Sequence, residues 1–242
     1  MLLRNLFASK PVRKFGTNYG GWLIPKDIQL DSNSIVYSAG AGEDISFDLH
    51  LQSYFNCNIL LIDPTPRSLV HLQELIRYYA SGDWLFSGNI QKDYEKKIKK
   101  MNIDFSKISL EEKGLWDSIG KLKFYKQNNI NNVSQTLVNG MFGNDYDLIE
   151  TCTIKSLMTE KKHEQIDLLK LDIEGAEIRV LNNMLDNQIQ PTYLCVEFDL
   201  KLKGKDFEDE TKKIIHRLKQ KGYKELINDN LNITFCLEKN KC

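Results

Sequence analysis

From about residue 34 onward, short apolar runs alternate with longer stretches whose apolar positions recur at helical spacing. The runs at 34–38 and 58–62 have the length and composition of strands. Each precedes a helical pattern, the first at 45–55 with Asp44 as its cap, the second beginning at Pro66. This alternation predicts parallel βαβ units.

The second half of the chain repeats the alternation and then changes at its end. Residues 166–171 form a nearly continuous apolar run with one lysine, which is typical of a strand buried on both faces. A helical pattern and a second buried strand at 193–196 follow. After a last helix that ends at Gly222, strand patterns at 223–227 and 233–237 flank an Asn/Asp turn. We therefore expect an α/β fold whose mostly parallel sheet ends in an antiparallel hairpin.

The hydrophobic pattern is less regular in the middle of the chain. Residues 81–105 are rich in lysine, which favours a solvated helix face over a binding patch. Short strand patterns lie at 107–110 and 121–125. The Asn- and Gly-rich stretch 127–143 predicts a long loop, and so long a loop in a compact domain often serves as a lid or a binding segment.

Length and charge narrow the classes of protein. A chain of 242 residues fits one domain, 1–242, in which residues 1–33 form an N-terminal extension expected to pack near the cofactor site. Lysine plus arginine equal aspartate plus glutamate at 33 each, so no global field attracts nucleic acid. No apolar run has the length of a membrane span. The five scattered cysteines include no CxxC pair, indicate neither zinc nor a disulfide framework, and lead us to expect a cytoplasmic protein.

Candidate binding residues gather where the predicted strands end, since ligands bind at the carboxyl ends of the strands in open α/β sheets. Gly40 and Gly42 allow a ligand to approach the backbone. Asp63 ends the second strand at the offset where an acid meets ribose hydroxyls in such folds. The residues we assign to cofactor binding are Ser38, Gly40, Ala41, Gly42, Asp44, Asp63, Pro64 and Asp172, together with Trp116 and Asp117 between the two middle strands.

The glycine turn discriminates between two cofactor classes. A dinucleotide site of the Gly-x-Gly-x-x-Gly kind needs a third glycine where this chain has Ile45. Glu43 and Asp44 would also repel a pyrophosphate at the helix start. A sulfonium cofactor without phosphate suits these acids better, and an NAD(P)-dependent oxidoreductase stays as an alternative.

Three segments resemble the landmark segments of FkbM-type methyltransferases: residues 37–48, residues 62–66 and the Leu-Lys-Leu-Asp-Ile-Glu-Gly block within 167–177. Residues 194–198 are similar to the next strand of that family. The resemblance implies a seven-stranded, three-layer class I methyltransferase (Rossmann-like) fold with S-adenosylmethionine as methyl donor. It also implies O-methylation of a hydroxyl on a sugar or other small natural-product-like acceptor. Asp63 departs from the glutamate of many members, and the stretch after Asp199 matches no family motif.

Three acids are candidates for the chemistry itself. Asp172 follows the most apolar strand and is expected to act as a base, a metal ligand or a cofactor contact. Glu174 and Glu197 are the other catalytic candidates, whereas Glu177 fits the ordinary preference for acids at a helix start. A divalent metal would suit these carboxylates but is not predicted. A module that binds S-adenosylmethionine without turning it over is the second alternative.

Overall fold

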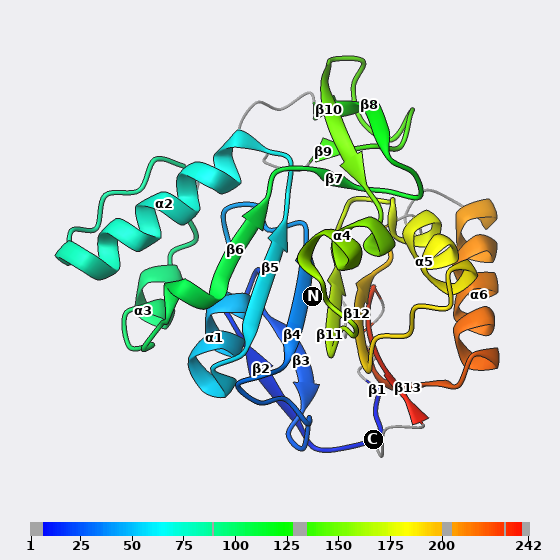
Figure 1. Cartoon of the computed structure of the whole chain (residues 1–242), viewed down its shortest axis with the longest axis horizontal. Helices are drawn as coiled ribbons and strands as arrows, with labels where there is room; N and C mark the ends of the chain where they lie inside the picture. Colours follow the sequence, from blue (N-terminus) through cyan, green and yellow to red (C-terminus); the bar gives the residue numbers. More distant parts are fainter. Residues whose placement is uncertain (1–6, 89, 128–134, 200–204, 230, 239–242) are drawn as a thin grey trace.

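The computed structural model describes residues 7–88, 90–127, 135–199, 205–229 and 231–238. Its largest element is an eight-stranded sheet in the order β1-β13-β14-β12-β11-β4-β5-β6 (Figure 1). The strands are β1 (Phe7–Ala8), β4 (Ile35–Ala39), β5 (Asn58–Ile62), β6 (Ile108–Glu111), β11 (Leu168–Leu171), β12 (Tyr193–Glu197), β13 (Tyr223–Asn228) and β14 (Asn232–Leu237). The sheet is therefore assembled from strands distributed along the whole described chain.

The direction of these strands confirms one expectation and corrects another. The run β12-β11-β4-β5-β6 is parallel throughout, and β13 and β14 form the antiparallel C-terminal hairpin. The expectation of seven strands is wrong, because the N-terminal strand β1 adds an eighth by pairing antiparallel with β13. Two residues of strand at the edge of a sheet have no periodicity that a sequence reading can detect.

Helices cover both faces of the sheet. Their bounds are α1 (Ser46–Phe55), α2 (Pro66–Ser81), α3 (Tyr94–Ile98), α4 (Ile154–Lys161), α5 (Glu177–Asp186) and α6 (Lys205–Gln220). Alternate residues of the strands divide between two apolar clusters, as the pleat of a sheet requires. Tyr37 and Leu169 belong to the cluster with α4, α5 and α6, while Val36 and Leu168 belong to the cluster with α1, α2 and α3. The result is three layers, with α2 and α6 at opposite ends of the view in Figure 1.

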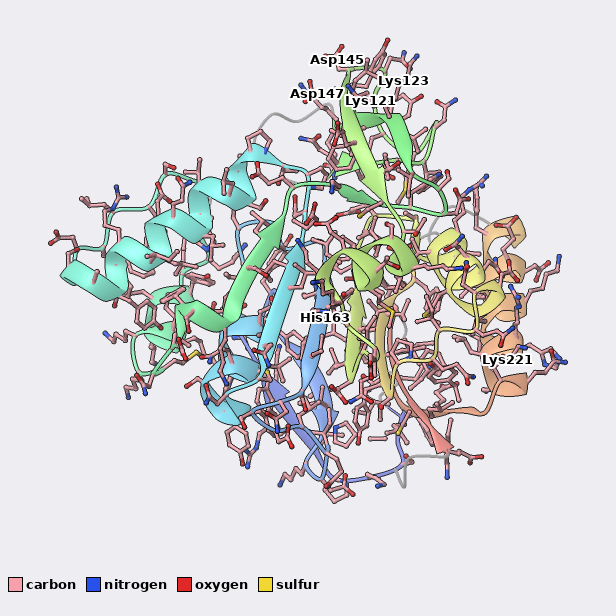
Figure 2. The ribbon with its side chains drawn as sticks, viewed as in Figure 1. Lys121, Lys123, Asp145, Asp147, His163 and Lys221 are labelled. Atoms are coloured by element: carbon pink, nitrogen blue, oxygen red, sulfur yellow. The ribbon has the colours of Figure 1, made fainter. Side chains whose placement is uncertain are left out.

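A smaller sheet of four strands, in the order β7-β10-β8-β9, stands at the top of the view in Figure 1. It consists of β7 (Gly114–Leu115), β8 (Gly120–Lys126), β9 (Gln135–Thr136) and β10 (Tyr146–Cys152). The charged side chains of Lys121, Lys123, Asp145 and Asp147 lie at the outer part of the β8–β10 pair (Figure 2). Residues 128–134 of the predicted loop fall outside the described residues.

The N-terminal segment forms a hairpin of β2 (Val12–Phe15) and β3 (Trp22–Pro25). Phe15, Trp22 and Ile24 are buried and join the apolar cluster around α1. Phe15 also contacts the ring of His50 on α1, with 4.3 Å between the ring centroids. The segment is thus part of the core rather than a loose extension.

Cysteine chemistry differs in one place from the expectation. Cys57, Cys152 and Cys195 are buried free thiols. Cys236 is in a disulfide, which the scattered cysteine spacing does not predict. Across the part of the chain that the structure describes, no helix combines the length and the apolar character needed to cross a membrane.

Candidate functional site

A cavity of about 400 Å³ lies over the carboxyl ends of β4, β5 and β11. Most of the residues that the sequence assigns to cofactor binding meet here, although they are far apart in the chain. The predicted residues that line the cavity are Gly40, Ala41, Gly42, Asp44, Asp63, Pro64, Asp172 and Glu174. This convergence follows from the parallel pairing of β4 with β5 and of β4 with β11, which aligns their ends.

Gly40 is required by the close approach of two strand ends. Its φ is +81°, and a Cβ atom there would lie 1.7 Å from the carbonyl oxygen of Asp172. Gly42, at φ +55°, has nothing within 4 Å of an added Cβ, so its surroundings are open. The first glycine therefore serves packing between β4 and β11, and the second leaves room for a ligand beside the backbone.

Asp63 already has partners within the protein. One carboxylate oxygen accepts the Gly42 N–H at 2.8 Å, and the other accepts the N–H and the hydroxyl of Thr65 at 2.8 and 2.6 Å. Its side chain is nearly buried. Asp63 thus fixes the shape of the glycine turn, and any ribose hydroxyl would have to use the remaining lone pairs of the same two oxygens.

The two acids of the glycine turn are also anchored. Glu43 makes a paired contact with Arg67 on α2, through Nε at 2.9 Å and Nη2 at 2.7 Å. Asp44 accepts the Ser46 N–H at 3.1 Å just before α1, but the N-cap position is Ile45, without a side-chain cap, so the expectation that Asp44 caps this helix is wrong. Arg67 therefore offsets the negative charge of Glu43, and Asp44 is held against the first turn of α1.

On the opposite side of the cavity, Asp172 makes an ion pair with a buried lysine. The ammonium of Lys170 lies 3.0 Å from Asp172 Oδ2, and the lysine side chain is only 6% exposed. Burial lowers the pKa of Lys170, but the carboxylates of Asp172 and Asp48 outweigh it and raise that pKa overall. In the sequence, Lys170 is the one charged residue in the apolar run 166–171 apart from Asp167, and this interruption of a buried strand is the signal of its role.

The elements that form the first cavity lie within the part of the chain that matches a known family. The model of the methyltransferase FkbM domain matches residues 32–225. This chain belongs to the FkbM methyltransferase domain family. It is therefore a methyltransferase by family, as the landmark segments predict. The comparison with curated proteins gives no match.

The FkbM domain has a second cavity, of about 580 Å³, beside the first. Tyr19, Gly20, Asp172 and Glu174 line both cavities, and Glu197 and Asn232 line only the second. The Oδ1 atom of Asn232 is buried and finds no hydrogen-bond partner among the described residues. A polar space therefore adjoins the glycine turn, with Asp172 and Glu174 at the boundary.

Asp172 and Glu197 directly follow Leu171 and Val196, which are paired across the parallel strands β11 and β12, so their carboxyl groups lie side by side within hydrogen-bonding reach. Burial, followed by the charges of Asp172 and Asp199, raises the pKa of Glu197 to about 9. Burial thus favours the protonated form of Glu197, which can donate to Asp172. The three predicted catalytic acids therefore lie close to the boundary between the two cavities. Asp172 and Glu174 line both cavities, and Glu197 lines the second.

Glu177 holds the turn that carries Asp172 and Glu174. Its Oε1 accepts the N–H groups of Ile173 and Gly175 at 2.9 and 3.2 Å. Glu174 has the left-handed backbone, at φ +53°, that this turn requires. Glu177 was expected to have a structural role at the start of the helix, and these contacts specify that role.

Three residues assigned to the cofactor lie elsewhere. Ser38 is fully buried within β4. Trp116 contacts the guanidinium of Arg179, 5.3 Å from the ring centroid, and Asp117 pairs with the same arginine at 3.1 Å. None of the three lines the first cavity. Trp116 and Asp117 instead attach the end of β7 to α5.

Two segments that the sequence left uncertain reach the first cavity. Gln127, Gln135 and Leu137, from the stretch predicted as a lid or binding segment, contribute to its lining, and so does Gln91 from the lysine-rich stretch. Tyr19 is mostly exposed at the mouth of both cavities. Within the described residues, no three His, Cys, Asp or Glu side chains are grouped so that they could hold a metal ion.

Proposed function

We propose that this FkbM-family protein is an S-adenosylmethionine-dependent O-methyltransferase with the class I methyltransferase fold. The observation that carries the proposal is the first cavity, where an open glycine turn, Asp63 and Asp172 converge at the carboxyl ends of three parallel strands. The order of the strands other than β1 is compatible with that fold. The family match spans 32–225 and the N-terminal segment lines the same cavity, so we propose one catalytic domain over 1–242.

The chemistry of the lining suits a sulfonium cofactor. Asp44, Asp63 and Asp172 line the cavity, whereas the charge of Glu43, which also lines it, is offset by Arg67. Carboxylates attract a sulfonium cation and repel the pyrophosphate of a dinucleotide. The open space beside Gly42 admits a ligand next to the backbone. When bound, S-adenosylmethionine supplies an activated methyl group.

The acceptor is proposed to be a small or carbohydrate-like molecule that enters from the second cavity. Asp172 borders both cavities, so a hydroxyl in the second one can approach a methyl group held in the first. The residues of the chain would align the acceptor and remove its hydroxyl proton, with Asp172 as the base.

Titration calorimetry of the full chain tests this function. We expect S-adenosylmethionine and its demethylated product to bind with one-to-one stoichiometry, and NAD⁺ and NADP⁺ to give no heat. Binding of a nicotinamide cofactor alone would favour an oxidoreductase. Binding of S-adenosylmethionine with no methyl transfer to any hydroxyl in an acceptor screen would favour a binding module without catalysis.

A further inference from the structure

The lysine beneath the site is unusual in its burial and its contacts. Lys170 extends from β11 toward the layer of α1, and its ammonium contacts both Asp172 Oδ2 at 3.0 Å and the Gly40 carbonyl oxygen at 3.4 Å. Asp48 of α1, which is buried as well, also acts on its charge. A buried ammonium is costly unless it is paired. Lys170 is therefore a fixed positive charge directly under the end of β11.

The two carboxyl groups above it are in different situations. Asp172 is the partner of the ammonium, whereas Glu197 extends from the neighbouring strand β12 and hydrogen-bonds to Asp172. Two carboxyl groups can form such a bond only when one of them holds a proton. The ion pair favours the charge on Asp172 and leaves the proton on Glu197.

The location of the pair connects it to both cavities. Asp172 lines the cavity with the glycine turn and also the second cavity, while Glu197 lines only the second. A hydroxyl at this boundary would meet an ionised oxygen and, beside it, a protonated carboxyl. Both a proton acceptor and a proton donor are thus available at one point.

We propose that Asp172 and Glu197 act on the acceptor hydroxyl as one proton-sharing carboxyl pair, and that Lys170 is the positioning residue that assigns the charge to Asp172. This inference rests on the proposed methyl transfer. In the transfer, the acceptor oxygen forms a bond to the methyl carbon, and the electron pair of the broken carbon–sulfur bond stays with sulfur. The hydroxyl proton passes to Asp172. Because Glu197 and Asp172 are hydrogen-bonded, a proton of the pair can then leave through the second cavity.

Other charged groups surround the pair and belong to the same titration. Those that face it, from every neighbouring element, are Lys14, Tyr19, Asp44, Asp48, Glu174, Asp199 and Asp229. Lys170 differs from all of these groups, because it is a buried cation in direct contact with Asp172. Removal of its charge should therefore move the titration of the pair more than removal of any exposed lysine.

Carbon-13 NMR of the full chain, labelled at the Asp and Glu carboxyl carbons, measures this directly and needs no acceptor. We expect a carboxyl titration step near pH 9 in the wild type, and its disappearance in Glu197→Gln, which assigns it to Glu197. In Lys170→Met this step should move to higher pH by about one unit or more, because a neighbouring positive charge is removed. Lys113→Met removes a lysine that pairs with Glu111 at 2.7 Å, and it should leave the step in place.

The outcomes separate this inference from the proposed function. If Glu197 titrates near the ordinary glutamate value, or if Lys170→Met does not move its titration step, the proposal of a proton-sharing pair is overturned. If Lys170→Met fails to fold, the wild type and Glu197→Gln still decide whether Glu197 holds the proton. Calorimetry on the same samples tests the cofactor. Normal S-adenosylmethionine binding with an uncoupled pair overturns this inference alone, whereas no binding by the wild type overturns the proposed function and the role of the pair with it.

Discussion

At the scale of single residues, two glycines in one turn have different reasons to be glycine. A Cβ at Gly40 would collide with the Asp172 carbonyl oxygen, whereas one at Gly42 would meet nothing within 4 Å. Gly40→Ala should lower the free energy of unfolding by roughly 2–5 kcal/mol, through overpacking and left-handed strain together. Gly42→Ala is the matched control and should cost only the strain, about 1–2 kcal/mol. Urea denaturation measures both, and equal losses would mean that the ends of β4 and β11 are free to separate.

At the scale of elements, the N-terminal segment is attached to the start of α1 by one buried threonine. The Thr17 hydroxyl donates to Asp44 at 2.6 Å and accepts the Gly20 N–H at 3.0 Å. The Thr17 N–H donates to the Ser46 hydroxyl at 2.8 Å. These bonds hold residues 16–20 beside the mouth of both cavities.

Thr17→Val should therefore leave Asp44 Oδ2 and the Gly20 N–H, both partly buried, without the threonine hydroxyl as a partner. We expect a loss of about 1–3 kcal/mol in the free energy of unfolding and faster hydrogen exchange at the Gly20 amide. Thr159→Val, which removes an exposed hydroxyl bonded to the Lys155 carbonyl on α4, should stay within about 0.5 kcal/mol of the wild type. Unchanged protection of Gly20 in Thr17→Val would show that the hairpin alone holds the segment.

At the scale of the whole molecule, buried titratable groups link stability to pH. Burial, and then the charge of Asp199, raises the pKa of Glu177 to about 8. The folded chain therefore keeps a proton that the unfolded chain releases near pH 4.5. This contribution is complete below that pH and is lost as the pH rises toward 8. His71 acts in the other direction, because burial lowers its pKa to about 4 and stability is lost as the pH falls from 6.5 to that value.

Glu177→Gln should remove the loss of stability that the wild type shows as the pH rises. Glutamine retains an oxygen for the Ile173 and Gly175 N–H groups but does not titrate. Between pH 5 and 8 the wild type should lose roughly 4 kcal/mol more of its unfolding free energy than the variant, at about 1.4 kcal/mol per pH unit. Urea denaturation at several pH values measures this, with Glu208→Gln on the exposed face of α6 as control. Parallel pH profiles for wild type and Glu177→Gln would contradict the assignment.

The sequence alone determined the parts of this protein that local pattern can encode. The parallel strands β4, β5, β11 and β12 and the terminal hairpin follow from apolar runs and turn residues. Gly40, Asp63 and Asp172 were placed at one edge because strand ends of a parallel sheet coincide. The family followed from the same segments.

Only the tertiary structure decided which partners these residues have. Glu197 beside Asp172 and the attachment of Thr17 to Asp44 join elements far apart in the chain. Lys170 and Asp172 are close in the sequence, but their pairing depends on the burial of the lysine against the Gly40 carbonyl oxygen of β4–α1. The same holds for β1, whose two residues become an eighth strand only because β13 offers an edge. The periodicity of a sequence indicates which face of a helix or strand is buried. It contains no information about which distant side chain packs against that face.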